Sequence, residues 1–299
     1  MKVLIIGLPY FANKIAQSLA VFDGDNDFVV LNTDGKLIDK VKHLLHLLKA
    51  DVIYSVGGSL ARSKTIDIAL AFRKKIVMHW VGTDVLNAIS DFRKNNINIK
   101  YINGIHHLCE VSWIQEELMQ VGINAEIVQF ATFDKKIATV NCLPEQFSIL
   151  SYVAKGREEF YGIEKLLRLA SDFPDIEIKI VGISEYYKSA PANVKFLGWV
   201  ENMDEQYQNC VLYLRMPEHD GLAFSVLEAL ANGRYVGYSY EFDNVFFIKN
   251  YTELSRVVKG IKNSFELGEL TDNKKGRDFI VENFISDKVL SGLVSILKY

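Results

Sequence analysis

Two acidic side chains, Asp220 and Glu228, lie in the segment whose residue types and spacing are best suited to chemistry. Asp220 directly precedes Gly221, and Glu228 lies inside an apolar run that ends at Gly233. An ionised carboxylate only accepts hydrogen bonds and accepts them on two oxygens, which suits the paired hydroxyls of a ribose or a sugar ring. The segment therefore predicts a site for a ligand that contains a sugar.

The elements around these acids predict where they lie. We expect a strand over Val211–Arg215 and a helix over Ser225–Asn232, with a loop containing Pro217 between them. In open α/β sheets, ligands bind outside the carboxyl ends of the strands. The first N–H groups and the positive dipole end of the new helix would stabilise a pyrophosphate there. Two isolated acids would more often be solvated surface groups, but this shared pattern favours a site.

The first half of the chain alternates short apolar runs with amphipathic stretches, which is typical of βαβ units and a mostly parallel sheet. The expected strands are Lys2–Ile6, Asp27–Leu31, Val52–Ser55, Lys75–His79 and Glu126–Gln129. The expected helices are Asn13–Val21, Lys36–Lys49, Ser63–Phe72 and Trp113–Gln120.

The periodicity lapses around Phe130–Glu145, where we place a linker, and a second alternation follows. Its expected strands are Phe147–Val153, Ile176–Val181, Val194–Phe196, Val211–Arg215 and Tyr235–Tyr238. Its expected helices are Ile163–Ser171, Met203–Gln208 and Ser225–Asn232, and the tail from Asn273 to Tyr299 is expected to be helical.

Composition excludes several classes of protein. The chain has 299 residues, 49% of them hydrophobic, and a net charge of -3, so it lacks the basic field that holds a nucleic-acid backbone. Its three cysteines are too few and too scattered for a disulfide framework. No apolar run approaches membrane-spanning length. We expect a cytoplasmic protein that does not bind nucleic acid.

The segment from Asp220 to Gly233 resembles the donor-site motif of retaining glycosyltransferases of the GT-B fold. That motif has two glutamates separated by seven residues, usually within Glu-Gly-Phe-Gly-Leu-x-x-Leu-Glu-Ala-Met-Ala-x-Gly. Here Asp220 takes the first acidic position and Glu228 the second. The other matches are Gly221, Leu227, Ala229, Ala231 and Gly233.

The resemblance implies a role for each matched residue. Glu228 would hold the donor ribose, and Asp220, as a catalytic residue, would face the donor sugar. Gly198 and Trp199, in Phe-Leu-Gly-Trp-Val, look like the family's strand and turn at the base pocket. The amides that would face the donor sugar and phosphates belong to Gly221, Leu222, Ala223 and Phe224.

In the first half, the run from His79 to Asp84 is similar to the family's His-containing Gly-Thr-Asp loop. The resemblance makes His79 a second catalytic candidate and places the acceptor near Gly82, Thr83 and Asp84. A structural histidine satisfied by its neighbours explains His79 nearly as well, so both interpretations stay open.

One position departs from the family pattern. Members usually carry an Arg and then Lys-Gly early in the second domain, and both basic residues bind the donor pyrophosphate. Tyr161 stands where that lysine is expected. Lys155 and Arg157 could supply the charge, or could form a solvated pair balanced by nearby glutamates. Arg215 is the third candidate.

The resemblance implies two Rossmann-like α/β domains facing across a cleft, the GT-B fold. The expected divisions are 1–135 on the acceptor side, 146–280 for the nucleotide sugar, and a closing helix over 281–299. The implied reaction, as in polysaccharide biosynthesis, moves a hexose from a nucleotide diphosphate sugar to a hydroxyl of a glycan, a lipid-linked acceptor or a small molecule, with retention. The resemblance implies no cofactor and no metal.

Two alternatives remain. One is a different GT-B enzyme, such as a sugar-nucleotide epimerase, and the other is a non-catalytic subunit that binds a nucleotide sugar. An NAD-dependent oxidoreductase is disfavoured because the first βα turn, starting at Gly7, lacks Gly-x-Gly-x-x-Gly.

The stretch Lys36–Lys49 predicts an amphipathic helix with a basic side. We favour the interpretation that its apolar face packs on the sheet and its lysines face water. The second interpretation is peripheral contact with anionic lipid at the inner face of a membrane.

Overall fold

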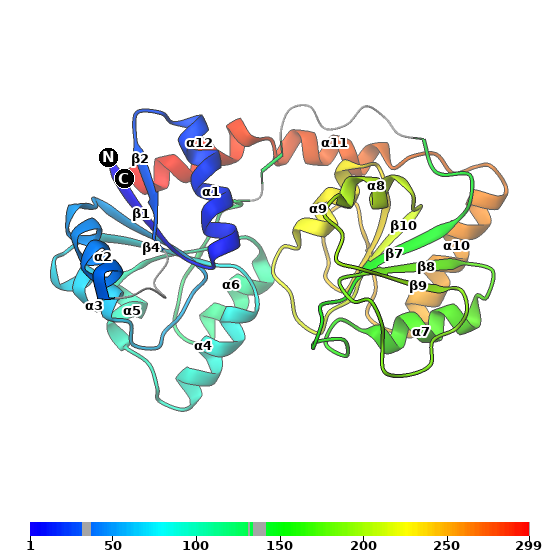
Figure 1. The fold of residues 1–299 in the computed structure, drawn as a ribbon, viewed down its shortest axis with the longest axis horizontal. Helices are drawn as coiled ribbons and strands as arrows, with labels where there is room; N and C mark the ends of the chain where they lie inside the picture. Colours follow the sequence, from blue (N-terminus) through cyan, green and yellow to red (C-terminus); the bar gives the residue numbers. More distant parts are fainter. Residues whose placement is uncertain (32–36, 131, 134–141, 299) are drawn as a thin grey trace. The chain divides into compact units, whose positions relative to one another are not determined.

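The computed structural model describes residues 1–31, 37–130, 132–133 and 142–298. The chain divides into two compact units. Unit 1 comprises Met1–Thr132 together with Phe284–Tyr299, and unit 2 comprises Phe133–Asn283. Each contains a six-stranded sheet (Figure 1). The predicted pair of Rossmann-like α/β sheets is therefore confirmed.

Unit 1 is built on a parallel sheet whose strands occur in the order β2-β1-β3-β4-β5-β6. Helices cover both faces of such a sheet, so its central strands are continuously apolar rather than alternating. The strands are β1 Lys2–Gly7, β2 Asp27–Val30, β3 Val52–Val56, β4 Lys75–Trp80, β5 His106–Cys109 and β6 Glu126–Ile127. The helices are α1 Pro9–Phe22, α2 Leu37–Lys49, α3 Lys64–Ala71, α4 Thr83–Arg93, α5 Ile99–Gly104, α6 Ser112–Met119 and α12 Ser286–Lys298.

The last helix, α12, belongs to unit 1 although it ends the chain. It packs against α1, and Lys298 forms an ion pair with Asp23 just beyond α1 at 3.1 Å. Lys75 at the start of β4 donates to the carbonyl of Ile296. Figure 1 shows this red helix beside the blue helix α1. The buried side chains of α12 are Val289, Leu290, Leu293, Val294 and Leu297.

Unit 2 is built on a second parallel sheet, in the order β12-β11-β10-β7-β8-β9. Its strands are β7 Ser148–Tyr152, β8 Glu177–Val181, β9 Val194–Gly198, β10 Leu212–Arg215, β11 Tyr235–Tyr238 and β12 Phe246–Phe247. Its helices are α7 Ile163–Asp172, α8 Met203–Gln208, α9 Phe224–Ala231, α10 Tyr251–Glu266 and α11 Lys274–Asn283.

The strand order of unit 2 reverses between β7 and β10. From β7 the chain adds β8 and β9 on one side, and then returns to add β10, β11 and β12 on the other. The chain therefore leaves the adjacent strands β7 and β10 in opposite directions along the sheet. Such a switch point is where open α/β sheets bind ligands. The segment from Arg215 to Glu228 begins there.

Helix α2 does not present the face that we predicted from its pattern. Among positions 41–49, where side chains are described, Leu47 is buried, and His43 and His46 are half-buried beside it. Val41 and Leu45, which belong to its apolar face, are 54% and 51% exposed. Over positions 41–49 the predicted apolar docking face is therefore wrong, because the helix turns its histidine side inward, whereas Lys42 and Lys49 face water as predicted.

The elements that sequence patterns missed are α4, α5, β5, α10 and β12. Helix α1 begins at Pro9, earlier than predicted, because proline is accommodated at the first helical position where its missing N–H removes no bond. The predicted linker, 130–145, lies partly outside the described residues, at 131 and 134–141.

Candidate functional site

An ion pair links the end of β10 to the loop that follows it. Nε of Arg215 donates to Oδ2 of Asp220 at 2.8 Å, and the two side chains are only 9% and 16% exposed. Arg215 is the last residue of β10, so its guanidinium lies at the switch point of the sheet. A charge-assisted hydrogen bond shielded from water is stronger than an exposed one.

Two tyrosine rings from the neighbouring strand and loop pack on the guanidinium of Arg215. Its central carbon lies 4.8 Å from the ring centre of Tyr161 and 5.6 Å from that of Tyr152. Burial acts to lower the pKa of Arg215, but Asp220 and then Tyr213 outweigh it, so the net pKa is raised. Arg215 is thus a permanently charged group held in a fixed direction.

Hydrogen bonds from the end of β11 and the two residues after it hold the Asp220 loop in place. The Tyr238 hydroxyl donates to the carbonyl of Gly221 at 2.8 Å, and the Ser239 hydroxyl donates to the carbonyl of Pro217 at 3.1 Å. The amide of Asp220 donates to the hydroxyl of Tyr240 at 3.1 Å. The loop is therefore a preorganised part of the site.

The β7–α7 loop approaches the β10–α9 loop at Gly162. Its φ is +77°, and a Cβ at this position would lie 2.8 Å from the carbonyl oxygen of Met216. No other residue type fits this left-handed, crowded position without strain. The amide of Glu218 also donates to the carbonyl of Phe160 at 2.8 Å. Both loops therefore form one wall at the carboxyl edge of β7 and β10.

Helix α9 begins at Phe224 without a side-chain cap, because Ala223 stands at the N-cap position. Alanine offers no oxygen to the first N–H groups of the helix, which are the groups that a bound anion accepts from. Leu222 and Ala223 are buried, at 5% and 7% exposure. They contribute backbone rather than side chain to this end of the helix.

Glu228 lies one turn further into α9 and is half-buried. The Tyr207 hydroxyl donates to its Oε2 at 3.0 Å. Tyr207 is completely buried, and burial, then Tyr213, then Glu228 raise its pKa well above the ordinary value. Tyr207 therefore stays a donor and fixes the direction of the Glu228 carboxylate.

Lys155 and Arg157 lie on the exposed part of the β7–α7 loop. The amide of Gly156 donates to Glu158 at 2.9 Å, which closes a tight turn between them. The guanidinium carbon of Arg157 lies 3.9 Å from the ring centre of Phe160. Arg157 is thus directed by an aromatic ring on the same loop that carries Tyr161.

Gly198 and Trp199 lie at the carboxyl end of β9, two strands away from β7 in the sheet. The amide of Gly198 donates to the carbonyl of Ile183 at 2.9 Å. Trp199 is 79% exposed, which is high for an indole of this size. Its exposed ring offers an apolar surface for stacking at the same edge of the sheet.

In unit 1, the predicted site residues His79 and Asp84 form hydrogen bonds within the fold. His79 is completely buried, its Nδ1 lies 2.8 Å from the Tyr54 hydroxyl, and burial lowers its pKa to about 3. Asp84 accepts from the amides of Gly58 and Gly82 at 2.6 and 2.8 Å, and burial raises its pKa against these bonds. Gly82 is the N-cap of α4, and Thr83 begins that helix.

The burial of His79 predicts a pH dependence of stability. The unfolded chain binds a proton near the ordinary pKa of 6.5, whereas the folded residue binds it only near pH 3. The unfolded state therefore binds more protons in this window, so the stabilisation is complete above pH 6.5 and falls as the pH drops. From pH 7 to pH 5 the free energy of unfolding should fall by about 2 kcal/mol from this residue.

The measurement is urea unfolding of the wild type and His79→Gln at both pH values. The variant should lose about 2 kcal/mol less than the wild type on acidification. An equal loss in both proteins would show that His79 does not titrate as its burial requires.

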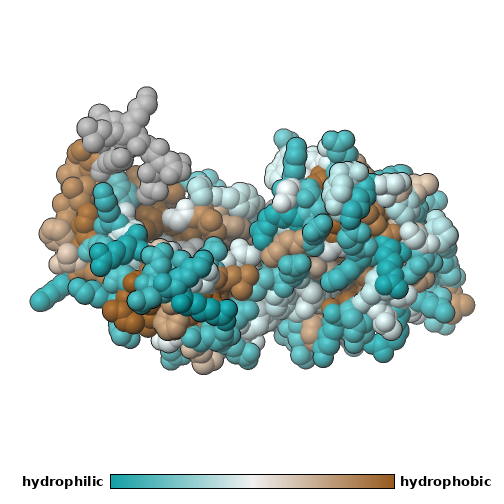
Figure 2. Space-filling view, turned by 90° about the horizontal axis from the view of Figure 1, so that it is seen from below, coloured by the Kyte–Doolittle hydropathy of each residue, from teal (hydrophilic) through white to brown (hydrophobic). Residues whose placement is uncertain are grey.

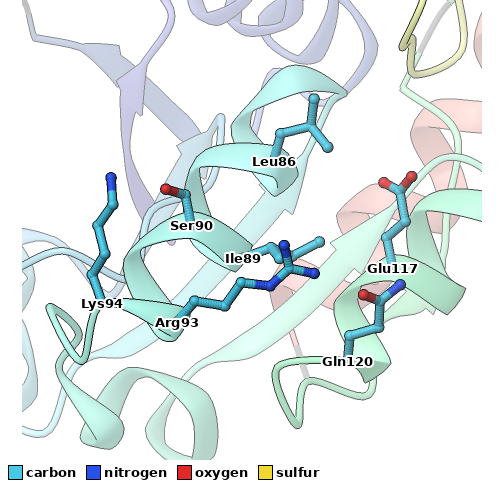
Figure 3. A pocket seen from close by; sticks show the side chains of 7 residues that line it. All are labelled: Leu86, Ile89, Ser90, Arg93, Lys94, Glu117 and Gln120. Carbon is cyan, nitrogen blue, oxygen red and sulfur yellow. The ribbon is translucent and has the colours of Figure 1, made fainter.

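A surface groove in unit 1 lies between α4 and α6 (Figure 3). Arg93 on α4 extends toward Gln120 at the end of α6, and Ile89 forms part of the floor. The lining residues are Leu86, Ile89, Ser90, Arg93, Lys94, Glu117 and Gln120. None of the predicted site residues lies in this groove.

Among the described residues, no three His, Cys, Asp or Glu side chains gather in a way that could hold a metal ion.

The structure brings some of the predicted site residues together in unit 2, and others belong to unit 1. Asp220, Arg215 and the start of α9 form one cluster in unit 2, with Glu228 further along the same helix. His79, Gly82, Thr83 and Asp84 belong to unit 1. Sequence analysis did not identify Tyr152, Tyr207, Tyr238 or Tyr240 as partners of the site. No local motif marks these tyrosines, because their strands and helices meet the loop only after folding.

No family model matches the chain, and no curated protein does. Solved structures share its fold at low sequence identity. Sucrose-phosphate synthase from Thermosynechococcus elongatus matches with a TM-score of 0.66 and 12% identity, over 100% of this chain and 98% of that chain. The pneumococcal O-GlcNAc transferase GtfA, in complex with UDP and GlcNAc, matches with a TM-score of 0.59 and 10% identity, over 83% of this chain.

The fold alone does not separate the classes of enzyme. A putative UDP-N-acetylglucosamine 2-epimerase from Listeria monocytogenes matches with a TM-score of 0.54 and 11% identity, over 99% of this chain and 95% of that chain. The chain spans only 56% of GtfA and 55% of Staphylococcus aureus TarM. The chain therefore has the GT-B fold of nucleotide-sugar glycosyltransferases, and its reaction has to be argued from the site.

Proposed function

We propose that the protein is a retaining glycosyltransferase that moves a hexose from a nucleotide diphosphate sugar to a hydroxyl acceptor. The observation that carries the proposal is the clustering of Arg215 and Asp220 at the uncapped start of α9, with Glu228 one turn further along. Charge for a diphosphate, the positive N-terminal end of a helix and a carboxylate for a diol occur there in the order that a donor requires.

In this proposal Arg215 and the N–H groups at the start of α9 bind the diphosphate and stabilise the charge that develops as it leaves. Glu228, directed by Tyr207, accepts from the ribose hydroxyls. Asp220 accepts from a hydroxyl of the donor sugar. Trp199 stacks on the base. Catalysis then rests on positioning and on stabilisation of the leaving diphosphate, and the protein supplies no nucleophile.

The test is a thermal-shift screen of UDP, GDP and ADP together with their glucose and N-acetylglucosamine sugars. A ligand that binds only the folded protein raises the melting temperature. One base should stand out, and both its diphosphate and its sugar should stabilise the protein. No shift with any of these nucleotides would overturn the proposal.

A non-catalytic subunit that binds the nucleotide sugar is the second candidate. Tyr161 in place of a lysine favours it, as does the engagement of Arg215 by Asp220. An epimerase is a third, on the fold alone. Product analysis separates the three. A transferase releases diphosphate and glycosylates an acceptor, an epimerase returns an isomeric nucleotide sugar, and a binding subunit leaves the donor unchanged.

The loop cations Lys155 and Arg157 are expected to bind the diphosphate from its solvent side. Replacing both by alanine should weaken binding of the nucleoside diphosphate about tenfold and leave binding of the plain nucleoside unchanged, because charged hydrogen bonds to the phosphates are lost. Isothermal titration with both ligands measures this difference. The matched control is Arg256→Ala with Lys259→Ala, an exposed pair on α10. Equal weakening of both ligands would remove Lys155 and Arg157 from the phosphate site.

A further inference from the structure

Helix α2 in unit 1 packs on the rest of the fold through its more polar side. His43, His46 and Leu47 face inward, and Nε2 of His43 lies 3.0 Å from the hydroxyl of Thr65 on α3. Leu47 is the only fully buried residue among positions 41–49. Within these positions, little of the apolar surface of the helix is therefore buried against the rest of unit 1.

The opposite side of α2 exposes an apolar stripe, formed by Val41, Leu44, Leu45 and Leu48. Their exposed fractions are 54%, 40%, 51% and 37%. The spacing i, i+3, i+4, i+7 places all four on one face of the helix. A contiguous apolar patch is costly to leave in water and marks an interaction site more often than chance exposure does.

A second exposed apolar side chain lies near the C-terminal end of α2. Phe72, just after α3, is 60% exposed. The ammonium group of Lys74 donates to the carbonyls of Leu48 and Ala50 at 2.8 and 2.7 Å, which ties this turn to the end of α2. Figure 2 shows hydrophobic residues along the margin of unit 1 where Figure 1 places α2 and α3.

The exposed charges of the described part of α2 are positive, and Asp51 is exposed just beyond its end. Lys42 and Lys49 are exposed on α2, and Arg73 is exposed beside Phe72. Within positions 41–49, whose side chains are described, there is no acidic residue. An acidic surface therefore complements this face, whereas a second copy of the same face would bring like charges together. A helix with an apolar stripe and flanking lysines fits the interface of an anionic bilayer, where the apolar face enters the headgroup boundary.

We propose that unit 1 binds the surface of an anionic lipid bilayer through the α2 stripe, Val41, Leu44, Leu45 and Leu48. The helix lies in the plane of the interface, with Lys42 and Lys49 at the level of the headgroups. Among the described helices, none is long and apolar enough to cross a membrane. This proposal does not depend on the proposed donor chemistry, and the two can fail separately.

The experiment is co-sedimentation of the full chain with vesicles of phosphatidylcholine alone and of phosphatidylcholine with phosphatidylglycerol. The wild type should bind the anionic vesicles, and binding should weaken when the salt rises from about 0.1 M to about 1 M, because the Debye length falls about threefold. Leu44→Ser with Leu45→Ser should lower the partition coefficient at least about tenfold, since two leucine side chains no longer enter the apolar boundary. Lys42→Glu with Lys49→Glu should lower it on anionic vesicles specifically.

The matched control is Val21→Ser with Leu267→Ser, two exposed apolar residues outside α2, at 90% and 71% exposure. It should sediment like the wild type. Circular dichroism and melting curves establish that each variant is folded. The charge-reversal pair and the salt series test the proposal again if the serine pair fails to fold. Absence of wild-type binding to anionic vesicles would overturn the proposal. So would a dimer in sedimentation velocity that dissociates in the serine pair, because the stripe would then cover a second copy.

Discussion

Replacing Glu228 by glutamine is expected to weaken binding of the nucleotide sugar and of its nucleoside diphosphate by about tenfold or more. The carboxylate is directed by the buried Tyr207 hydroxyl at 3.0 Å, so its geometry does not have to be created when the ligand binds. Hydrogen bonds to a charged group contribute about 1.5 to 3 kcal/mol each. The glutamine amide is neutral and keeps only one acceptor oxygen. Isothermal titration with the nucleotide chosen by the thermal-shift screen measures the loss.

The control for Glu228→Gln is Glu205→Gln, an exposed glutamate in the first turn of α8, which changes the net charge by the same amount. It should bind like the wild type. Tyr207→Phe should show a smaller loss than Glu228→Gln, because it frees the carboxylate without removing it. If Glu228→Gln binds the diphosphate with unchanged affinity, the carboxylate is not in the donor site.

The sequence predicted the architecture because hydrophobic periodicity and fold class are linked. Most strands of both sheets are buried apolar runs, and Ser148–Tyr152 and Leu212–Arg215 were predicted to within one residue at each end. The missed helix α4, Thr83–Arg93, does carry a helical pattern, since its buried residues Val85, Ala88 and Ile89 recur at i, i+3 and i+4. The contact that positions its start, in which Asp84 accepts from the amide of Gly58 at 2.6 Å, follows from no local pattern. Such a contact joins segments that are distant in the sequence.

The site was predictable where its residues are consecutive and not where they converge from different strands. Asp220 and Glu228 share one loop and helix, so their spacing carries information. The rings of Tyr152 and Tyr161 reach Arg215 from β7 and its loop, and no spacing along the chain reports that contact. The inward face of α2 was also unpredictable, since a pattern gives two faces but not which of them is buried.

The Arg215–Asp220 pair should separate stability from function in a double-mutant cycle. Arg215→Met leaves a largely buried carboxylate without its cation and should lower the free energy of unfolding of unit 2 by about 3 kcal/mol. Asp220→Leu should also be destabilising, because it leaves the buried guanidinium of Arg215 without its carboxylate partner. The double variant replaces the pair by apolar side chains and should recover most of the loss, because desolvation of both charges is then avoided. Urea unfolding of the four proteins measures the coupling.

Binding in the same four proteins distinguishes a ligand-binding arginine from a structural one. If Arg215 binds the donor diphosphate, the double variant recovers stability but still fails to bind the nucleoside diphosphate, since no cation has been restored at the end of β10. Its affinity for the plain nucleoside should stay near that of the wild type, because Glu228 and Trp199 are unchanged. Recovery of diphosphate binding together with stability would show that Arg215 only holds the loop. The diphosphate would then have to be bound by the start of α9 with Lys155 and Arg157, and the proposal for those two residues would become the stronger one.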